Sequence, residues 1–407
     1  MTTKTASRLL YVSTWLTDFT FMLLVFTISR DLAEKDADLL TMGFVGGMLS
    51  LIYAFSGIFL GRLSDRFGRR KFILSGVAGL LVCCFGCLVL EANSWPYLIA
   101  YWLAGAALGM IYPALIAWLQ QGQHPDHQAR HAGRVVLRFC VAWNLGLISG
   151  QLTGGFLFDL GRHVPIVLAM LLSAANLVMI LLTGRTSSRP APHASPPQEH
   201  HLQRQALTAG FAKLNWIANL GTAFSMSMIF HLFPKLAVNL EIAPETHGTV
   251  LAVMRVTVIA TYLLLYLSNF WHLRFDVPLI AQGLGIIGLA ALAVAHGVTQ
   301  VTMGLMAFAV LVGYNYFAGL FYSTTSRGDE KQGWVSGMHE GTLAVGFTGG
   351  SMGGGLVGVY GGPGAPYLLG IAVIVVMVAV QIVIYLREVR PMHRKTVLQP
   401  LPPACPD

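Results

Sequence analysis

The sequence predicts an all-α integral membrane protein with twelve transmembrane helices, and two observations carry this prediction. First, 55% of the 407 residues are hydrophobic and only 11% are charged, whereas about a quarter of the residues in a soluble domain are charged. Second, twelve apolar runs recur along the chain, each reaching the roughly 20 residues that a helix needs to cross a bilayer. Segments of this length must be helices, because a bilayer offers no water to unpaired backbone groups.

The apolar runs form two groups of six. The first group comprises residues 9–29, 42–61, 71–91, 96–119, 132–158 and 163–184. The second group comprises residues 208–231, 247–270, 275–296, 299–323, 334–360 and 364–387. Residues 185–207 are rich in Pro, Ser and His and cannot bury an apolar face, so we expect a flexible cytoplasmic linker there. We therefore expect six-helix bundles at 1–184 and 208–388, with a cytoplasmic tail at 389–407.

An internal repeat relates the two groups. When the chain is shifted by 204 residues, the fifth run aligns with the eleventh and the fourth with the tenth. The matched pairs are Gly133 and Gly337, Gly146 and Gly350, Gly150 and Gly354, Gly154 and Gly358, Gly109 and Gly313, and Tyr112 and Tyr316. Such self-similarity indicates two pseudo-symmetric halves of related structure.

The positive charges predict the orientation. If the amino terminus is cytoplasmic, 20 of the 26 Lys and Arg residues lie in cytoplasmic segments and 4 on the other side, while Arg138 and Arg255 fall within runs. Positive residues accumulate in cytoplasmic loops, so we expect both termini in the cytoplasm. This placement also explains the net charge of +8, and we expect no nucleic-acid partner. The first run has no small-residue cleavage site and contains Asp18, so we interpret it as an uncleaved helix.

The loop between the second and third runs carries a recognisable pattern. Residues 60–71 read Leu-Gly-Arg-Leu-Ser-Asp-Arg-Phe-Gly-Arg-Arg-Lys. This segment resembles the loop between helices 2 and 3 of major facilitator superfamily (MFS) transporters, roughly G-x-L-x-D-R-x-G-R-[RK]. The matching residues are Gly61, Leu63, Asp65, Arg66, Gly68, Arg69 and Arg70. The resemblance implies a secondary transporter in which two six-helix bundles rock around a substrate site at the midplane.

The resemblance also implies a gating role for this loop. Asp65 would lock the cytoplasmic side closed by binding the positive amino-terminal end of the eleventh helix, near Gly333. Arg66, Arg69 and Arg70 would pair with cytoplasmic acids or lipid headgroups, and a role in topology alone is the alternative. In the second half Asn269 replaces the acid, so this gating contact is expected in one half only.

The fifth run contains a second pattern. Residues 146–155 resemble the G-x-x-x-G-P-x-x-G-G motif of MFS antiporters, with Gln151 in place of the proline. We expect the glycines of this run and their counterparts to allow close helix packing. They are Gly146, Gly150, Gly154, Gly155, Gly350, Gly354 and Gly358. The motif favours antiport over uptake, and the missing proline leaves uptake open.

Ionisable residues within the runs are the candidates for coupling. A charge at the centre of a bilayer costs about 2.5–3.5 kcal/mol on insertion scales. The candidates are Asp18, Arg138, Arg255, His339 and Glu340. We hypothesise that Asp18 and Glu340 carry protons, with Arg138 and Arg255 as counter-charges or anion contacts. Structural ion pairs and snorkelling arginines are the alternatives, and His339 is expected to be mainly a packing residue.

Two features bear on coupling and on the substrate. Tyr101 occupies a position where many proton-coupled members have arginine, so coupling must use other residues or be absent. By resemblance, helices 1, 4, 7 and 10 line the substrate site. The candidates that face it are Asp18, Tyr112, Asn219, Tyr314, Asn315 and Tyr316. Aromatic residues with polar tips suit an amphiphilic substrate, although Tyr and Asn also serve simply to bridge helices.

Other chemistries find little support in the sequence. There is no G-x-x-x-x-G-K-[ST] phosphate loop, nucleophile elbow or extramembrane catalytic domain. We interpret the five cysteines as apolar fillers rather than as a metal or disulfide site, and His193, His200 and His201 as solvated loop residues. We expect no enzyme activity, cofactor or metal.

We therefore predict a monomeric proton-coupled exporter of a small molecule, in a bacterial inner membrane. The alternatives are proton-linked uptake of a small organic anion or other metabolite, and a non-transporting sensor on the same fold.

Overall fold

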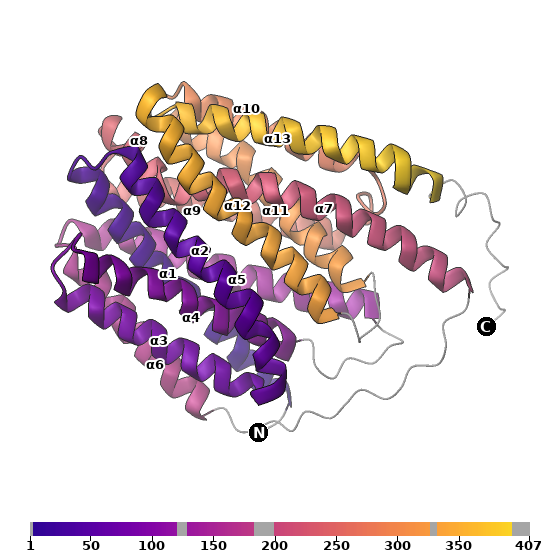
Figure 1. The fold of residues 1–407 in the computed structure, drawn as a ribbon, viewed down its shortest axis with the longest axis horizontal. Coiled ribbons are helices and arrows are strands. Elements are labelled where there is room, and N and C mark those ends of the chain that lie inside the picture. The colour runs from indigo at the N-terminus through magenta and orange to yellow at the C-terminus, as the bar shows by residue number, and fades with distance from the viewer. Residues whose placement is uncertain (1–2, 120–127, 183–198, 326–331, 393–407) are drawn as a thin grey trace.

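A computed structural model describes residues 3–119, 128–182, 199–325 and 332–392, and these segments are helical apart from short turns (Figure 1). The first six helices are α1 (Thr3–Glu34), α2 (Leu39–Phe67), α3 (Arg69–Val89), α4 (Trp95–Leu119), α5 (Gln128–Phe158) and α6 (His163–Leu182). The next are α7 (Glu199–His231), α8 (Phe233–Asn239), α9 (Pro244–Leu267), α10 (Asp276–Ala293), α11 (Val298–Thr325), α12 (Gln332–Gly361) and α13 (Ala365–Ile384), followed by the π-helical turn η3 (Tyr385–Val389).

The all-α membrane prediction is confirmed. Within the described segments, 11 helices are long and apolar enough to cross a membrane, and the count becomes 12 if α7 and α8 form one span. The short helix α8 was not predicted. It begins after a 45° bend, and Pro234 lies in its first turn. Proline lacks the N–H that would continue the preceding helix, which explains a break at this position.

Helices extend beyond two of the expected boundaries. Helix α7 begins at Glu199, so residues 199–207 of the expected linker are helical, while 185–198 lie outside the described residues. The sequence Leu-Gln-Arg-Gln-Ala-Leu in this stretch consists of good helix formers. Helical structure also continues to Met392, into the expected tail, and residues 393–407 are not described.

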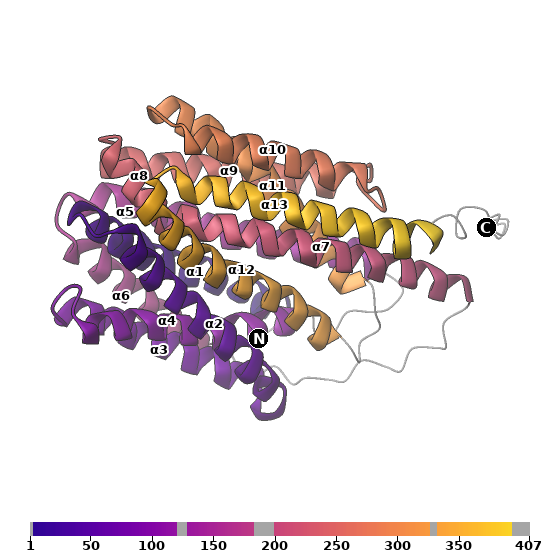
Figure 2. The same cartoon turned by 45° about the horizontal axis from the view of Figure 1, so that its top comes forward.

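The helices form two bundles that lie side by side, α1–α6 and α7–α13 (Figures 1 and 2). The turns at 35–38, 159–162 and 240–243 gather at one end of the molecule, which we call the loop end. The start of α1 and the turn η3 lie at the opposite end, which we call the termini end. Towards the termini end, α7 and α13 run away from the N-terminal bundle.

Glycines bring α5 against α1 within the N-terminal bundle. A Cβ added to Gly146 would lie 2.6 Å from the Cβ atom of Asp18, and one added to Gly150 would lie 2.6 Å from the Cβ atom of Met22. Gly154 follows on the same line and faces Phe26. The absence of side chains therefore lets the two backbones approach closely beside Asp18.

The C-terminal bundle repeats this arrangement with α12 and α7. A Cβ on Gly350 would overlap the carbonyl oxygen of Phe224, and one on Gly354 would lie 2.9 Å from the Cδ1 atom of Leu232. Gly350 and Gly354 are the repeat counterparts of the α5 glycines. Both halves thus use the same helix-packing contact.

Two seams join the bundles at the loop end. In the first, Gly43 of α2 lies against the Ser351 carbonyl of α12, and a Cβ on Gly358 would lie 2.6 Å from Leu39. In the second, a Cβ on Gly155 of α5 would lie 2.6 Å from the Pro244 carbonyl oxygen of α9. Gly155 and Gly358 therefore pack between the bundles. The other glycines that were predicted to allow close helix packing lie within one bundle.

Candidate functional site

Asp18 is buried in the middle of α1, with 1% of its surface exposed. The hydroxyl group of Tyr112, on α4, donates a hydrogen bond to its Oδ1 atom. The indole of Trp143, on α5, lies close to the same carboxyl group. Three helices of the N-terminal bundle thus converge on Asp18, and the side-chain-free ridge of α5 makes that convergence possible.

Glu340 supplies the matching acid from the C-terminal bundle. Its Oε2 atom accepts a hydrogen bond of 2.8 Å from the hydroxyl group of Tyr53, on α2. The ring of Tyr53 meets that of Tyr112 edge to face, with centroids 6.4 Å apart. We call these four residues, Asp18, Tyr112, Tyr53 and Glu340, the acid–tyrosine group. The group spans both bundles, since its bond to Glu340 is an inter-bundle contact.

Arg255 is a buried cation near this group. Its guanidinium lies 5.0 Å from the ring centroid of Phe230 and donates to the sulfur of Met226 at 3.8 Å. It is close enough to Asp18 to interact electrostatically, but no ion pair within 4.0 Å joins it to an acid among the described residues. The face of Phe230 is therefore one stabilising contact of this cation.

Aromatic and amide side chains join the bundles beside the acids. Trp143 of α5 packs on Tyr316 of α11 with ring centroids 4.6 Å apart. Next to it, Asn144 donates to the hydroxyl group of Tyr262, on α9, at 3.3 Å. This arrangement offers flat apolar faces with polar edges, which suit an amphiphilic molecule.

Two of the predicted lining residues, Asn315 and Tyr314, make contacts within the C-terminal bundle. Asn315 donates to Thr222 at 2.7 Å within the C-terminal bundle. The ring of Tyr314 faces Trp271, with centroids 6.3 Å apart. Asn219 is buried in α7. Of the α11 candidates, Tyr316 is the one with a described ring contact to the other bundle.

The remaining predicted residues lie elsewhere or outside the description. Arg138 is exposed and interacts electrostatically with Tyr11 rather than with the acid–tyrosine group. Arg70 donates to the carbonyl oxygens of Ile180 and Leu181 at 3.3 and 2.8 Å, which caps the end of α6. The side chains of Asp65, Arg66 and His339, and any Cβ contact of Gly61, lie outside the described residues.

Sequence analysis missed Tyr53, Trp143 and Arg30. The first two lie on α2 and α5, whereas the family resemblance directed attention to helices 1, 4, 7 and 10. The sequence did contain one indication of these two residues: Tyr53 and Trp143 each place a polar group within an apolar run. The first predicted run ended at residue 29, whereas α1 continues to Glu34 and contains Arg30, which is 5% exposed.

The described residues contain no group of three His, Cys, Asp or Glu side chains that could hold a metal ion. The thiols of Cys83, Cys84, Cys87 and Cys140 are buried and unbridged. The described side chains of the site present carboxyl, hydroxyl, indole and guanidinium groups.

Sequence comparison identifies relatives that match part of the chain. Over 152 residues the chain is 28% identical to the tetracycline resistance protein, class C, of Escherichia coli, which covers 37% of this chain and 36% of the relative. Over 138 residues it is 32% identical to the protein ZINC INDUCED FACILITATOR-LIKE 1 of Arabidopsis thaliana, covering 33% of this chain and 27% of the relative. The matched segments thus span about a third of the length of these relatives.

Solved structures share the fold at low sequence identity. The nucleoside transporter NupG superposes with a TM-score of 0.66 at 14% identity, over 93% of this chain and 100% of that chain. A structure from work on proton dependent oligopeptide transporters gives a TM-score of 0.71 at 13% identity, over 97% and 100%. The family model of the Major Facilitator Superfamily matches residues 10–337. The chain therefore belongs to the Major Facilitator Superfamily and is a multi-pass integral membrane protein.

Proposed function

We propose that the protein is a proton-coupled secondary transporter that exports a small amphiphilic molecule by rocking its two bundles. The observation that carries this proposal is the acid–tyrosine group. It contains one acid from each bundle, and a tyrosine from the N-terminal bundle binds the acid of the C-terminal bundle.

The hydrogen bond between Tyr53 and Glu340 supplies a physical route for coupling. Hydrogen bonds to an ionised carboxylate are roughly twice as strong as those between neutral groups. Protonation of Glu340 therefore weakens an inter-bundle contact that must break when the bundles rock. Asp18 can bind a second proton, or a substrate group, while Tyr112 stays bonded to it.

The proposed direction rests on orientation and on the relatives. We place both termini in the cytoplasm of a bacterium, following the 20 to 4 charge distribution. The seams at the loop end then close the outer side, so the described conformation is inward-facing. Tetracycline resistance proteins among the relatives, and the glycine motif of α5, favour export. We propose that Asp65 stabilises the opposite, outward-facing state. We also propose that the protein acts as a monomer.

Proton-linked uptake of an organic anion is the second candidate. The guanidinium of Arg255 is buried, and its Nε atom has no hydrogen-bond partner among the described residues. An anionic substrate would provide one. A solved structure of the human organic anion transporter MFSD10 shares the fold, with a TM-score of 0.63 at 12% identity over 94% of this chain and 100% of that chain.

Flux in proteoliposomes tests the proposal. Purified protein would be reconstituted with tetracycline or salicylate as probe, and uptake followed with and without an imposed pH gradient. We expect tetracycline to exchange against protons, and we expect Asp18→Asn and Glu340→Gln to abolish the effect of the gradient. Asp276→Asn, at an exposed carboxylate paired with Arg274, is the matched control.

Three results would contradict proton-coupled export. The first is gradient-driven flux that persists in both variants with an unchanged pH dependence. The second is salicylate moving together with protons while tetracycline stays outside, which supports the uptake candidate. The third is ligand binding without flux of either probe, which indicates a sensor.

A further inference from the structure

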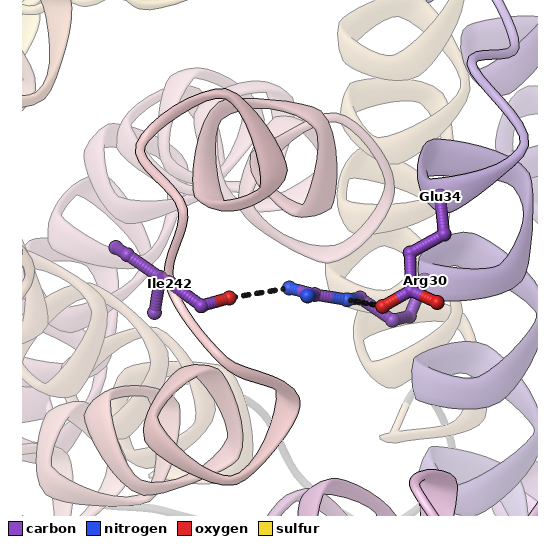
Figure 3. Close-up of polar contacts among 3 residues, drawn as sticks. All are labelled: Arg30, Glu34 and Ile242. Carbon is purple, nitrogen blue, oxygen red and sulfur yellow. Dashed lines mark hydrogen bonds and ion pairs between the residues drawn. The ribbon is translucent and has the colours of Figure 1, made fainter.

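Arg30 connects the two bundles at the loop end (Figure 3). From α1, its Nη1 atom donates a hydrogen bond of 3.0 Å to the carbonyl oxygen of Ile242, in the turn between α8 and α9. Its Nε atom donates to Glu34, one turn along α1, at 2.8 Å. Only 6% of the Arg30 side chain is exposed. Glu34 thus orients the guanidinium, whose other arm reaches the C-terminal bundle.

A second cation reaches across in the opposite direction. Lys235 of α8 forms an ion pair with Asp36, in the turn that follows α1. The Lys235 side chain is 12% exposed, whereas that of Asp36 is 96% exposed. Hydrogen bonding to Lys235, followed by its charge, lowers the pKa of Asp36. The Asp36 carboxyl therefore stays ionised and paired throughout the mildly acidic and neutral range.

The two contacts are related by the internal repeat. Arg30 and Lys235 are 205 residues apart, and so are Asp36 and Glu241. Both acids have a positive φ, 58° and 54°. A shift of 205, one more than the 204 that aligns the later helices, therefore superposes the ends of α1 and α8.

The helix ends themselves have the same geometry. The N–H groups of Asp36 and Ala37 donate to the carbonyls of Ala33 and Leu32 at 3.1 and 2.9 Å. After α8, the N–H groups of Glu241 and Ile242 donate to the carbonyls of Val238 and Ala237 at 2.9 and 2.8 Å. Both patterns are Schellman caps, with the acid in the left-handed position. Each cation therefore contacts the cap of the helix equivalent to its own.

An aromatic cluster fills the space next to Arg30. The imidazole of His247, at the start of α9, packs against Phe26 of α1 and Phe233 of α8, with ring centroids 4.8 and 5.1 Å apart. His247 is fully buried. These rings limit the access of water to the Arg30 contact, and a hydrogen bond is stronger where water is excluded.

We propose that Arg30 and Lys235 form a reciprocal latch that keeps the loop end closed. Each half of the repeat supplies one cation and one capped helix end, so the two contacts form and break together when the bundles rock. The buried Arg30 contact is the stronger, because its donor is charged, shielded and already oriented by Glu34. The exposed Lys235 contact contributes less.

Distances between spin labels on the two bundles test the latch without any substrate. One pair of labels would sit at the loop end, on Leu160 and Tyr360, and another at the termini end, on Leu182 and Leu267. All four native side chains are exposed. The background would carry Cys405→Ser, since Cys83, Cys84, Cys87 and Cys140 are buried.

We expect Arg30→Gln to lengthen the loop-end distance and shorten the termini-end distance. The ratio of loop-end-open to loop-end-closed molecules should rise by about tenfold, the usual effect of losing a hydrogen bond to a charged group. Lys235→Gln should raise it by about twofold. Arg30→Lys retains the charge and should give an intermediate value. Lys213→Gln is the control, because its partner Glu388 belongs to the same bundle.

The latch is refuted if Arg30→Gln and Lys235→Gln both leave the two distance distributions of the parent protein unchanged. It is also refuted if Lys213→Gln shifts them as much as Arg30→Gln does. Should Arg30→Gln fail to give monodisperse protein, Arg30→Lys and Lys235→Gln decide the question. The latch is tested by the difference between parent and variants at one fixed pH, whereas the proposed proton coupling is tested by how these distances change with pH. The latch and the proposed transport mechanism can therefore fail separately.

Discussion

The two halves of the molecule share their packing and differ in their buried charges. Glycines of α5 lie on α1, and their counterparts in α12 lie on α7. Asn176 of α6 donates to the backbone carbonyl of Ser13 in α1, and Gln381 of α13 donates to that of Leu214 in α7, at 3.5 and 2.8 Å. The repeat has therefore preserved the contacts that hold each bundle together.

The ionisable residues of the site have no such counterparts. The shift of 205 residues that superposes the ends of α1 and α8 places Ala223 opposite Asp18, and the shift of 204 places Val136 opposite Glu340. Arg255 likewise corresponds to Leu51. Duplicated packing explains how the chain forms two similar bundles, whereas in the proposed mechanism the unduplicated charges bind protons or substrate. Each half therefore contributes differently to the proposed transport.

The largest expected effect concerns the shared packing. Gly350→Ala should lower the free energy of unfolding by about 3 kcal/mol, because the added Cβ overlaps the Phe224 carbonyl and α7 must shift. Gly341→Ala, in the same helix with nothing within 4 Å of its Cβ, should have little effect. Thermal unfolding in detergent measures both. Equal melting temperatures for the two variants would show that close packing of α12 on α7 is dispensable.

The next largest effect concerns Asp18, an acid that has no counterpart in the other half. Asp18→Asn should reduce proton-driven flux by at least about tenfold, since it removes a proton-binding group while keeping its size. Thr222→Val alters the residue next to the counterpart of Asp18 in α7 and breaks its hydrogen bond with Asn315. It should reduce flux by less than about threefold, as expected for a neutral hydrogen bond. Equal losses in both variants would remove the functional difference between the halves.

A smaller effect is expected on the ratio of the two conformations when a hydrogen bond between the bundles is removed, compared with one inside a bundle. Tyr53→Phe removes the hydrogen bond to Glu340 and should shift the ratio of the two conformations by about threefold. Tyr112→Phe removes the bond to Asp18, which lies in the same bundle, and should shift it much less. The spin-label distances measure both ratios. A larger shift for Tyr112→Phe would reverse this assignment.

The smallest effect is the pH response of the Lys235–Asp36 contact. Its stabilisation is fully present above the ordinary pKa of an aspartate. It is lost only as the pH falls through the lowered pKa of folded Asp36. We therefore expect the effect of Lys235→Gln on the loop-end distance to be equal at neutral and mildly acidic pH. If Lys235→Gln changed the loop-end distance at neutral pH but not at mildly acidic pH, this pairing of Lys235 with Asp36 would be contradicted.

Helix positions were predictable from the sequence because hydrophobic length records them directly. The expected run 96–119 and the helix Trp95–Leu119 agree within one residue. Polar stretches carry no such signal, so the start of α7 and the helix α8 were misplaced or missed. The repeat in the sequence correctly paired α5 with α12, because the same glycines recur at a fixed spacing.

The site was predictable only in part. Asp18 and Glu340 stood out as charges in apolar runs, and the tyrosine that binds Asp18 was among the candidates. Tyr53 was not, since a tyrosine in a helix that was not expected to line the site is indistinguishable from a packing residue. The contacts of Arg30 and Lys235 depend on how two distant helix ends meet, which no local pattern reveals.

The central claim is that protons bound by Asp18 and Glu340 bias the exchange between the two conformations. The most direct test follows the loop-end and termini-end spin-label distances from mildly alkaline to mildly acidic pH, in the parent and in the Asp18→Asn/Glu340→Gln double variant. We predict that the two distances of the parent change in opposite directions with pH and that those of the double variant do not change. Equal pH responses in both proteins, or none in the parent, would contradict the claim.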